Sequence, residues 1–306
     1  MDLQNSAAPM TGGPDRAIPD ERPESYVSPL VEFWLSFKRN RLALVGAGML
    51  IVIGLIAVLA PVLAPYNPTA MNFKEILLRP GTQGHLLGTD DLGMDVLSRL
   101  IWGSRVSLSV AFMVIAVSLS IGIFVGSVAG YYGGWIDMVF MRLVDILYSF
   151  PFFILAISIM AVLGPSLRNV MIALAMVSWT GYARLLRGQF LALKEAEFVE
   201  GARAAGASDF RIITRYLLPN AVAPIIVQAT LGMAGTILAA SGLSFLGMGA
   251  QPPQPEWGAM LNTGREYMRT APYLATYPGV AILLTSLAFN FVGDGLRDAL
   301  DPRLKQ

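Results

Sequence analysis

The stretch VSLSVAFMVIAVSLSIGIFVGSVAGYYGGWI, residues Val106 to Ile136, contains no charged side chain. A helix that crosses the hydrocarbon core of a bilayer needs about 20 mostly apolar residues, so this stretch is long enough to cross once. The rest of the chain is similar, because 55% of its 306 residues are hydrophobic and only 14% are charged. A soluble surface needs roughly 25–35% charged residues. The composition therefore predicts an integral membrane protein.

The remaining composition argues against several classes of function. The chain carries 22 Lys and Arg against 21 Asp and Glu, a net charge of +1, which gives no basic field for nucleic acid. It has no cysteine, which removes thiol catalysis and thiolate metal sites, and its one histidine, His85, cannot build a histidine metal site. A membrane-embedded enzyme would need more acids, bases or nucleophiles than remain. We expect no catalytic residue, no metal site and no cofactor bound by this chain.

Six charge-free runs are candidates for membrane-spanning helices. The fourth is short, and the fifth is too long for one span, although prolines and glycines at its two ends leave a helix near residues 220–246. Six spans predict an all-α integral membrane protein, with the boundary between spans three and four left open. The runs are 42–73, 106–136, 146–167, 169–183, 216–255 and 270–293.

The placement of basic residues predicts the orientation of the chain. With the N-terminus in the cytoplasm, the inside segments hold 15 basic residues and the outside segments hold 7. The positive-inside rule therefore predicts that both termini are cytoplasmic. We expect a disordered cytoplasmic tail, an amphipathic elbow helix at the membrane surface, a transmembrane domain and a second cytoplasmic tail. Their predicted ranges are 1–32, 33–41, 42–300 and 301–306.

Small residues recur at every fourth position in two of the runs. Small side chains let membrane helices approach closely, so these lines predict tight helix contacts, either within this subunit or with a second membrane subunit. None of the runs contains a charged residue, which argues against a secondary transporter, because such proteins usually need intramembrane charges. The two lines are Gly122, Gly126 and Gly130, and Gly232, Thr236, Ala240 and Ser244.

The loop 184–218 combines charged residues with small and apolar ones. Residues 189–205 have a helical composition, and Gly206 stands where a C-terminal cap belongs. Ser208 with Asp209 is typical of an N-terminal cap, here for a second helix that reaches Leu218. A helix–turn–helix with exposed small residues is suited to docking into a groove of another protein. A helix lying flat on the bilayer is the alternative, although its glutamates would then face anionic lipid.

This loop resembles the EAA loop of ABC importer permeases. That motif reads E-A-A, three residues, G, nine residues, I-x-L-P, and here Glu200-Gly201-Ala202, Gly206 and the tetrapeptide YLLP at 216–219 have the same spacing. Two positions depart from the motif, Gly201 at the central alanine and Tyr216 at the isoleucine. Because glycine lowers helix propensity by about 1 kcal/mol relative to alanine, the first helix is expected to be softer here.

Other segments extend the resemblance over nearly the whole chain. They narrow it to the C-type permeases of dipeptide, oligopeptide and nickel importers, with the dipeptide members nearest in likeness. Met94 stands where that family usually has arginine, which puts in doubt any ion pair that the arginine makes. The segments are HLLGTDDLG at 85–93, DVLSR at 95–99, GMGAQPP at 247–253, PEWG at 255–258 and GDGLRDALDP at 293–302.

The resemblance implies a type I ABC importer permease fold and a set of partners. A homologous second permease subunit would lie beside this chain in the membrane lipid of a bacterial inner membrane. Two ABC ATPase subunits would lie on the cytoplasmic side, and an extracytoplasmic peptide-binding protein on the other. The chain has no GxxxxGK[ST] phosphate loop, so ATP and Mg would bind to the ATPase subunits.

The implied function is import of dipeptides or oligopeptides, driven by ATP hydrolysis on the partner subunits. Nickel, opine or glutathione-like substrates are an alternative within the family, and an ATP-independent secondary transporter is an alternative of another class. Four aromatic residues, Tyr148, Phe150, Trp179 and Tyr182, could line a substrate path, but core packing explains them equally well.

The resemblance also implies two groups of site residues. ATPase coupling is expected at Phe198, Glu200, Gly201, Ala202, Ala205, Gly206, Ser208, Asp209 and Pro219. The outer segment 67–104 and the loop near residues 251–257 would face the binding protein through Asp90, Asp91, Asp95, Gln251, Glu256 and Trp257.

Three of these acids, Asp90, Asp91 and Asp95, also suggest a metal loop. Hard-cation loops need more oxygen ligands at set spacing, so we expect instead that Thr89 caps a helix with the acids in its first turn. The next residues, Val96 to Trp102, are expected to lie along the outer leaflet.

Overall fold

The computed structural model describes residues 28–300, so most of the predicted N-terminal tail and the whole of the C-terminal tail, 301–306, lie outside the described residues. Within them the regular secondary structure is helical. The helices are α1 (Pro29–Arg39), α2 (Arg41–Val58), α3 (Ala60–Leu63), α4 (Val96–Tyr132), α5 (Gly134–Tyr148), α6 (Phe152–Leu163), α7 (Leu167–Leu193), α8 (Glu197–Ala204), α9 (Asp209–Arg211), α10 (Leu218–Phe245), α11 (Trp257–Glu266) and α12 (Tyr273–Leu300), with a π-helical segment, Ile212–Leu217, before α10.

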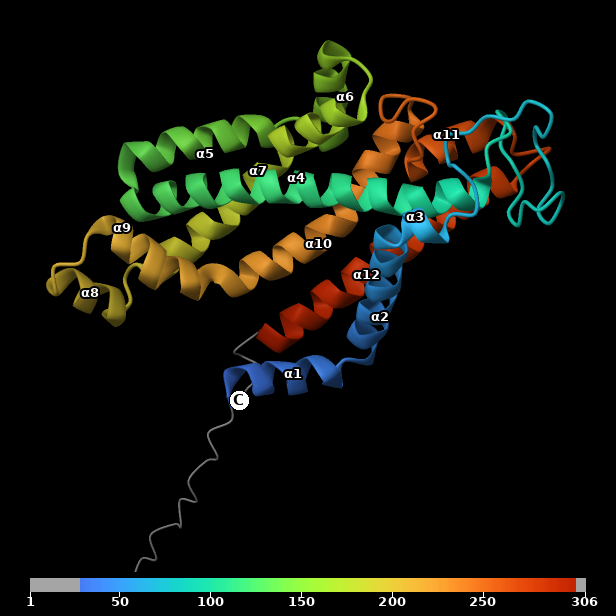
Figure 1. Ribbon diagram of the computed structural model, residues 1–306. Coiled ribbons are helices and arrows are strands. Elements are labelled where there is room, and N and C mark those ends of the chain that lie inside the picture. Colours follow the sequence, from blue (N-terminus) through green and yellow to red (C-terminus); the bar gives the residue numbers. More distant parts are fainter. Residues whose placement is uncertain (1–27, 301–306) are drawn as a thin grey trace, which may run out of the picture.

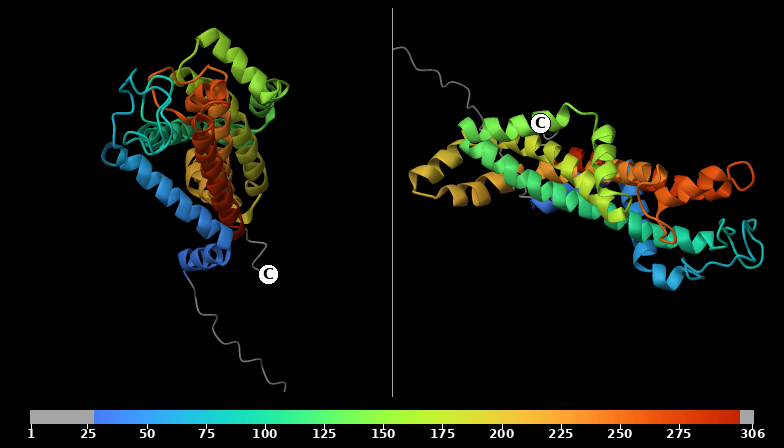
Figure 2. Two further views of the ribbon diagram at one scale, coloured as in Figure 1. Left: turned by 90° about the vertical axis from the view of Figure 1, so that its right-hand side faces the viewer. Right: turned by 90° about the horizontal axis from the view of Figure 1, so that it is seen from above.

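The long helices run side by side along an elongated bundle. Helix α4 packs against α7 and α10, and α12 packs against α2, α10 and α11 (Figure 1). The loop that carries α8 and α9 lies at one end of this bundle, and the loops that precede α4 and α11 lie at the other (Figure 2). The two predicted groups of site residues therefore occupy opposite ends of the molecule.

The six predicted spans correspond only in part to the helices. Among residues 28–300, four helical segments are long and apolar enough to cross a membrane, namely α2, α4, the continuous segment Asp209–Phe245 and α12. Helices α5 and α6 meet at a bend of 90° and, taken as one broken span, raise the number to five. Helix α7 is 27 residues long but carries Arg168, Arg184 and Arg187. The regular secondary structure of residues 28–300 is thus all-helical, with four or five segments of the length and composition of a membrane span against the six expected.

The predicted third span, 146–167, has the wrong boundaries. Ile146 lies near the end of α5, which begins at Gly134, and the chain then breaks at residues 149–151 before α6. The sequence pattern excluded Asp137 and Asp145 from the span because they are charged. In the fold these two residues lie within α5, and each pairs with an arginine of α7.

The start of α4 also differs from expectation. Asp95, not Thr89, is the N-terminal cap, since its carboxylate accepts a hydrogen bond of 2.7 Å from the Ser98 N–H. The residues from Val96 to Trp102 form the first turns of α4 and do not make a separate surface helix. Gly103 lets Trp257 pack against these turns, because a Cβ at residue 103 would lie 2.7 Å from the Trp257 ring.

The predicted elbow segment, 33–41, corresponds to helix α1, which begins earlier, at Pro29, within the predicted tail. Phe37 is buried against Ala43 and Ala299, whereas Trp34 is 49% exposed and the Lys38 ammonium lies 4.9 Å from the centre of its ring. One face of α1 therefore packs on the bundle while an aromatic and basic face points outward, as a helix at a membrane surface requires.

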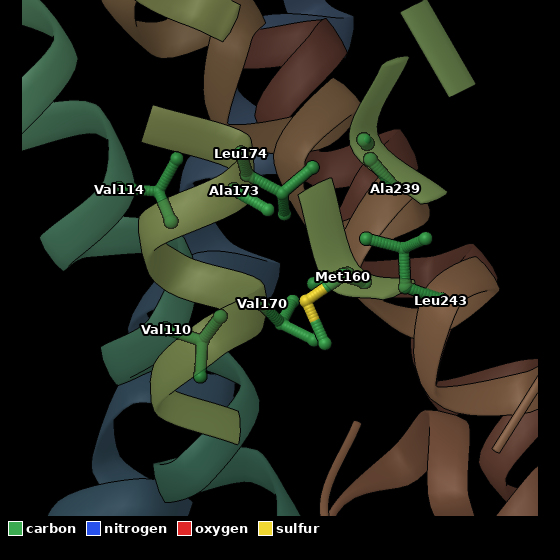
Figure 3. Packing of buried hydrophobic residues seen from close by; sticks show 10 residues of the cluster. Val110, Val114, Met160, Val170, Ala173, Leu174, Ala239 and Leu243 are labelled. Carbon is green, nitrogen blue, oxygen red and sulfur yellow. The ribbon is translucent and has the colours of Figure 1, made fainter. Parts of the chain in front are cut away.

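The glycine line of α4 packs against α7 within this subunit. A Cβ on Gly126 would lie 2.6 Å from the Ala183 carbonyl oxygen, and one on Gly130 would lie 2.7 Å from the Phe190 Cβ. The second small-residue line lies on α10, where Ala240 belongs to the main apolar cluster with Val114, Leu174 and Leu243 (Figure 3). Both lines therefore serve packing between helices of one chain.

Candidate functional site

Eight of the nine residues predicted to couple the chain to an ATPase lie in the loop between α7 and α10, residues 194–217, which is called the coupling loop. The predicted start at residue 184 is wrong, because α7 continues to Leu193, and the helix predicted over 189–205 is divided between the end of α7 and α8. Val199 of α8 and Ile212 are buried in one apolar cluster with Leu186, Phe190 and Leu217. Leu186 and Phe190 belong to α7, and Ala221 of α10 joins the same cluster, so apolar packing fixes the loop to both long helices. A force on the loop would therefore act directly on two helices of the bundle.

The turn of this loop is a Schellman motif. Gly206 has φ of +80°, its N–H bonds the Arg203 carbonyl, and the Ala207 N–H bonds the Ala202 carbonyl, both at 3.0 Å. This is the pattern in which a left-handed residue ends a helix and satisfies its last carbonyls. The predicted role of Gly206 as a helix cap is confirmed.

The second half of the loop differs from the predicted capped helix. The Ser208 side chain makes no capping hydrogen bond, and Asp209 instead accepts a bond of 2.7 Å from the Tyr131 hydroxyl at the end of α4. The chain continues through the π-helical segment into α10, so Pro219 lies in the first turn of α10 and ends no helix. The Leu218 N–H reaches back five residues to the Ile213 carbonyl, and Pro219 directly after it has no N–H to donate.

The outward face of the loop is open and carries several small residues beside charged ones. Glu200, Gly201, Ala205 and Gly206 are exposed, and a Cβ at either glycine would meet no atom within 4 Å. Ala202, by contrast, is only 8% exposed and faces the subunit itself. The exposed residues form a surface that another protein could approach closely.

Two phenylalanines flank this face. Phe198 is 42% exposed and Phe210 is 76% exposed. The sequence reasoning included Phe198 but missed Phe210, which follows the Ser208-Asp209 pair and so stands at the start of the second helical stretch. Large exposed aromatic side chains are typical of protein–protein contacts.

Replacing Gly201 with alanine is expected to stiffen α8. Residue 201 lies inside a helix, and the added methyl group would meet only open space, so the change should stabilise α8 by about 1 kcal/mol through helix propensity alone. Hydrogen exchange of the α8 amides should slow about fivefold, the factor that this energy gives. Unchanged exchange would show that packing, and not propensity, sets the stability of this helix.

The loops before α4 and before α11, residues 64–95 and 247–256, form an outer cap joined by Arg99. The Arg99 guanidinium donates to the carbonyls of Pro68 and Pro253, each at 3.0 Å, and pairs with the Asp90 carboxylate at 3.3 Å. The Met94 sulfur lies 2.9 Å from the same guanidinium. One buried arginine thus holds both loops against the start of α4.

The acids of the outer cap serve its internal structure. Burial raises the pKa of Asp90, against the opposing effects of Arg99 and of the Met94 and Leu92 N–H groups. The Asp95 carboxylate lies 2.8 Å from Nδ1 of His85, which is itself buried. The Glu256 carboxylate caps α11 by accepting from the Gly258 and Ala259 N–H groups, each at 2.9 Å.

Four of the residues predicted to contact the binding protein are buried, so this part of the predicted contact surface needs correction. Asp90, Asp95, Glu256 and Trp257 are at most 6% exposed, so they position the cap and are not available for direct contact in this conformation. Gln251 is exposed and Asp91 is half-buried, and these two keep the predicted role. In residues 28–300, no cluster of three or more His, Asp or Glu side chains is arranged to hold a metal ion.

Two cavities lie along one face of the bundle. The larger, of about 750 Å³, lies between α5, α6, α7 and α10 and is lined by Tyr148, Phe150 and Tyr182, whereas Trp179 is buried outside it. The second, of about 660 Å³, lies nearer the coupling loop, and Gln228 of α10 lines both. Three of the four aromatic residues considered for a substrate path thus share one concave surface.

These features define a multi-pass membrane protein with a loop of exposed small residues at one end and a cap of buried polar residues at the other. A family model described as a binding-protein-dependent transport system inner membrane component matches residues 122–306, and one described as the N-terminal TM domain of oligopeptide transport permease C matches residues 28–80. The chain belongs to the family of binding-protein-dependent transport system inner membrane components.

Curated relatives match over almost the full chain. The dipeptide transport system permease protein DppC of Haemophilus influenzae is 45% identical, with 91% of this chain and 96% of the relative covered. DppC of Alkalihalophilus pseudofirmus is 44% identical, with 100% of both covered. The glutathione transport system permease protein GsiD of Pectobacterium atrosepticum is 43% identical, with 94% of this chain and 96% of the relative covered.

A solved structure shows the same fold. The inward-facing MetNI methionine ABC transporter aligns with a TM-score of 0.53 at 21% identity and covers 67% of this chain and 97% of that chain. The predicted type I ABC importer permease fold is confirmed by this likeness together with the family match.

Proposed function

We propose that this chain is a permease subunit of an ATP-driven importer that brings dipeptides or oligopeptides into the cytoplasm. The observation that carries the proposal is the coupling loop, a small-residue face closed by a Schellman turn and packed onto α7 and α10. The relatives named as dipeptide permeases support a peptide substrate, and those named for glutathione support a glutathione-like tripeptide as the alternative.

In this proposal the coupling loop transmits movement. Two ATPase subunits bind ATP and Mg, and one of them receives the exposed face of α8 in a groove. Since Val199 and Ile212 fix the loop to α7 and α10, a displacement of the groove would move both helices together. ATP binding then shifts the equilibrium between inward-open and outward-open states, because the docked loop has different contacts in each.

The remaining partners follow from the two ends and the concave face. A homologous second permease would cover the face that holds the two cavities, so that the substrate path lies between the subunits. An extracytoplasmic binding protein would contact the outer cap near Asp91 and Gln251. The coupling loop and both termini would be cytoplasmic, in agreement with the excess of basic residues on that side.

Reconstitution tests the proposed function. In liposomes that contain both permeases, the ATPases and the binding protein, we expect peptide uptake that requires ATP; the peptide to use is the one that the purified binding protein retains. Liposomes without the ATPases should show no uptake. Uptake by the permeases alone would support a secondary transporter and contradict the proposal, and retention of nickel or an opine would correct the substrate class.

A further inference from the structure

Two ion pairs join α5 to α7, and they differ in character. Arg187 holds Asp137 through two hydrogen bonds, of 2.5 and 2.6 Å, and the two side chains are 30% and 17% exposed. One turn away, Arg184 makes a single bond of 2.9 Å to Asp145, and these side chains are 49% and 57% exposed. The first pair is a partly buried link between the two helices, whereas the charged groups of the second pair remain largely exposed.

The open pair lies beside the larger cavity. The Arg184 guanidinium stacks on the Tyr148 ring, with its Cζ atom 4.3 Å from the ring centre, and Tyr148 lines the cavity. Gly181, one turn before Arg184 on α7, lines it as well. The surface next to the two charges is therefore a concave, mostly apolar wall that contains aromatic rings.

The depth of the pair limits what can face it. Ala183, next to Arg184, packs against Gly126 in the last third of the charge-free part of α4. Gly126 is six residues from Tyr132, where α4 ends, which is about 9 Å along the helix. Charges at such a depth are costly against lipid chains and normally face water or protein. The exposed side of the pair is therefore expected to face water or a partner subunit and not lipid chains.

We propose that Arg184 and Asp145 form a charge-exchange site for zwitterionic peptides on the path, in which Arg184 takes the peptide carboxylate and Asp145 takes the peptide amine. An exposed ion pair contributes little to stability, so separating Arg184 from Asp145 costs little free energy. A ligand that carries both charges then leaves neither side chain unpaired. Tyr148 and the apolar wall would hold the peptide side chains. This site rests on the proposed function, since it assigns a substrate chemistry to the same path.

The test uses thiol labelling, for which this cysteine-free chain gives no background. In the assembled transporter without ATP, Gly181→Cys should react with a charged, membrane-impermeant thiol reagent. Ile51→Cys on α2 should not react. Residue 51 is 63% exposed and shares an apolar helix face with Leu44 and Leu55, which we expect to face lipid, where a charged reagent does not reach. Millimolar dialanine should slow the labelling of residue 181 about fivefold, a modest factor because exposed ion pairs contribute little binding free energy. Dialanine blocked at both ends should not slow it.

Matched variants identify the charges responsible. In the Gly181→Cys background, Arg184→Gln and Asp145→Asn should each abolish protection by dialanine, whereas Arg184→Lys keeps the charge and should retain it. Arg142→Gln removes an exposed positive charge one turn before Asp145 on α5 and should also leave protection intact. Absence of labelling at residue 181, equal protection by the blocked peptide, or protection that survives Arg184→Gln would each overturn the site.

These outcomes are independent of the proposed function. The labelling needs no ATP and no binding protein. If it shows no charge-exchange site, the ATP-dependent uptake that supports the proposed function is still valid. Conversely, uptake without the ATPases would contradict the proposed function but would not change the protection of residue 181 by dialanine.

Discussion

Replacing Gly206 with valine is expected to reduce ATP-driven uptake by about tenfold or more, because the left-handed conformation costs an L-residue about 1–2 kcal/mol and is worse for a β-branched one. Gly206 has φ of +80°, and its N–H and that of Ala207 close the end of α8. Valine would break this turn and change the shape of the face that docks on the ATPase. ATP hydrolysis should continue without import, which measurement of both rates in the same liposomes would show.

Two variants separate backbone strain from steric blocking. Gly206→Asn adds a side chain but tolerates a positive φ, so it should retain much more uptake than valine if the turn is what matters. If asparagine abolishes uptake as well, the side chain itself obstructs the partner. Gly201→Ala lies on the same face without a special φ and should transport normally. Normal coupled uptake by Gly206→Val would contradict the role assigned to the loop.

The second large effect is expected at the contact between α4 and α7. Gly126→Ala should lower the free energy of unfolding by about 2 kcal/mol, the usual cost of an overpacked methyl group. The new Cβ would lie 2.6 Å from the Ala183 carbonyl oxygen and 2.9 Å from the Leu186 Cβ, and a backbone atom cannot rotate away. The two helices must therefore separate, which thermal unfolding of the purified protein in detergent would report as a lower Tm.

The same substitution at Gly48 is the control. Gly48 lies on α2, and a Cβ there would meet no atom within 4 Å, so alanine should leave the Tm unchanged or raise it slightly through better helix propensity. Equal Tm values for Gly126→Ala and Gly48→Ala would show that the glycine line does not set the packing. A loss seen only in the assembled transporter would instead place that line at an interface with another subunit.

The outer cap shows how far sequence reasoning could reach. Its acids were visible as a cluster near Asp90, but the sequence could not tell surface carboxylates from buried ones. The buried partner of Asp90 is Arg99, which also bonds the Pro253 carbonyl, 154 positions away along the chain. A binding surface predicted from residue type alone therefore included four residues that the fold turns inward.

The sequence by itself determined the membrane environment, the end of α8 at Gly206 and the position of the coupling loop. These features depend on neighbours in the chain, namely a long apolar run, a glycine where φ must be positive, and a fixed spacing from Glu200 to Pro219. Only the tertiary structure decided where the third span breaks, which acids are buried, and that the glycine line packs within this subunit. Those outcomes depend on contacts between distant residues, such as Asp137 with Arg187 and Gly126 with Ala183, whose energies no local pattern contains.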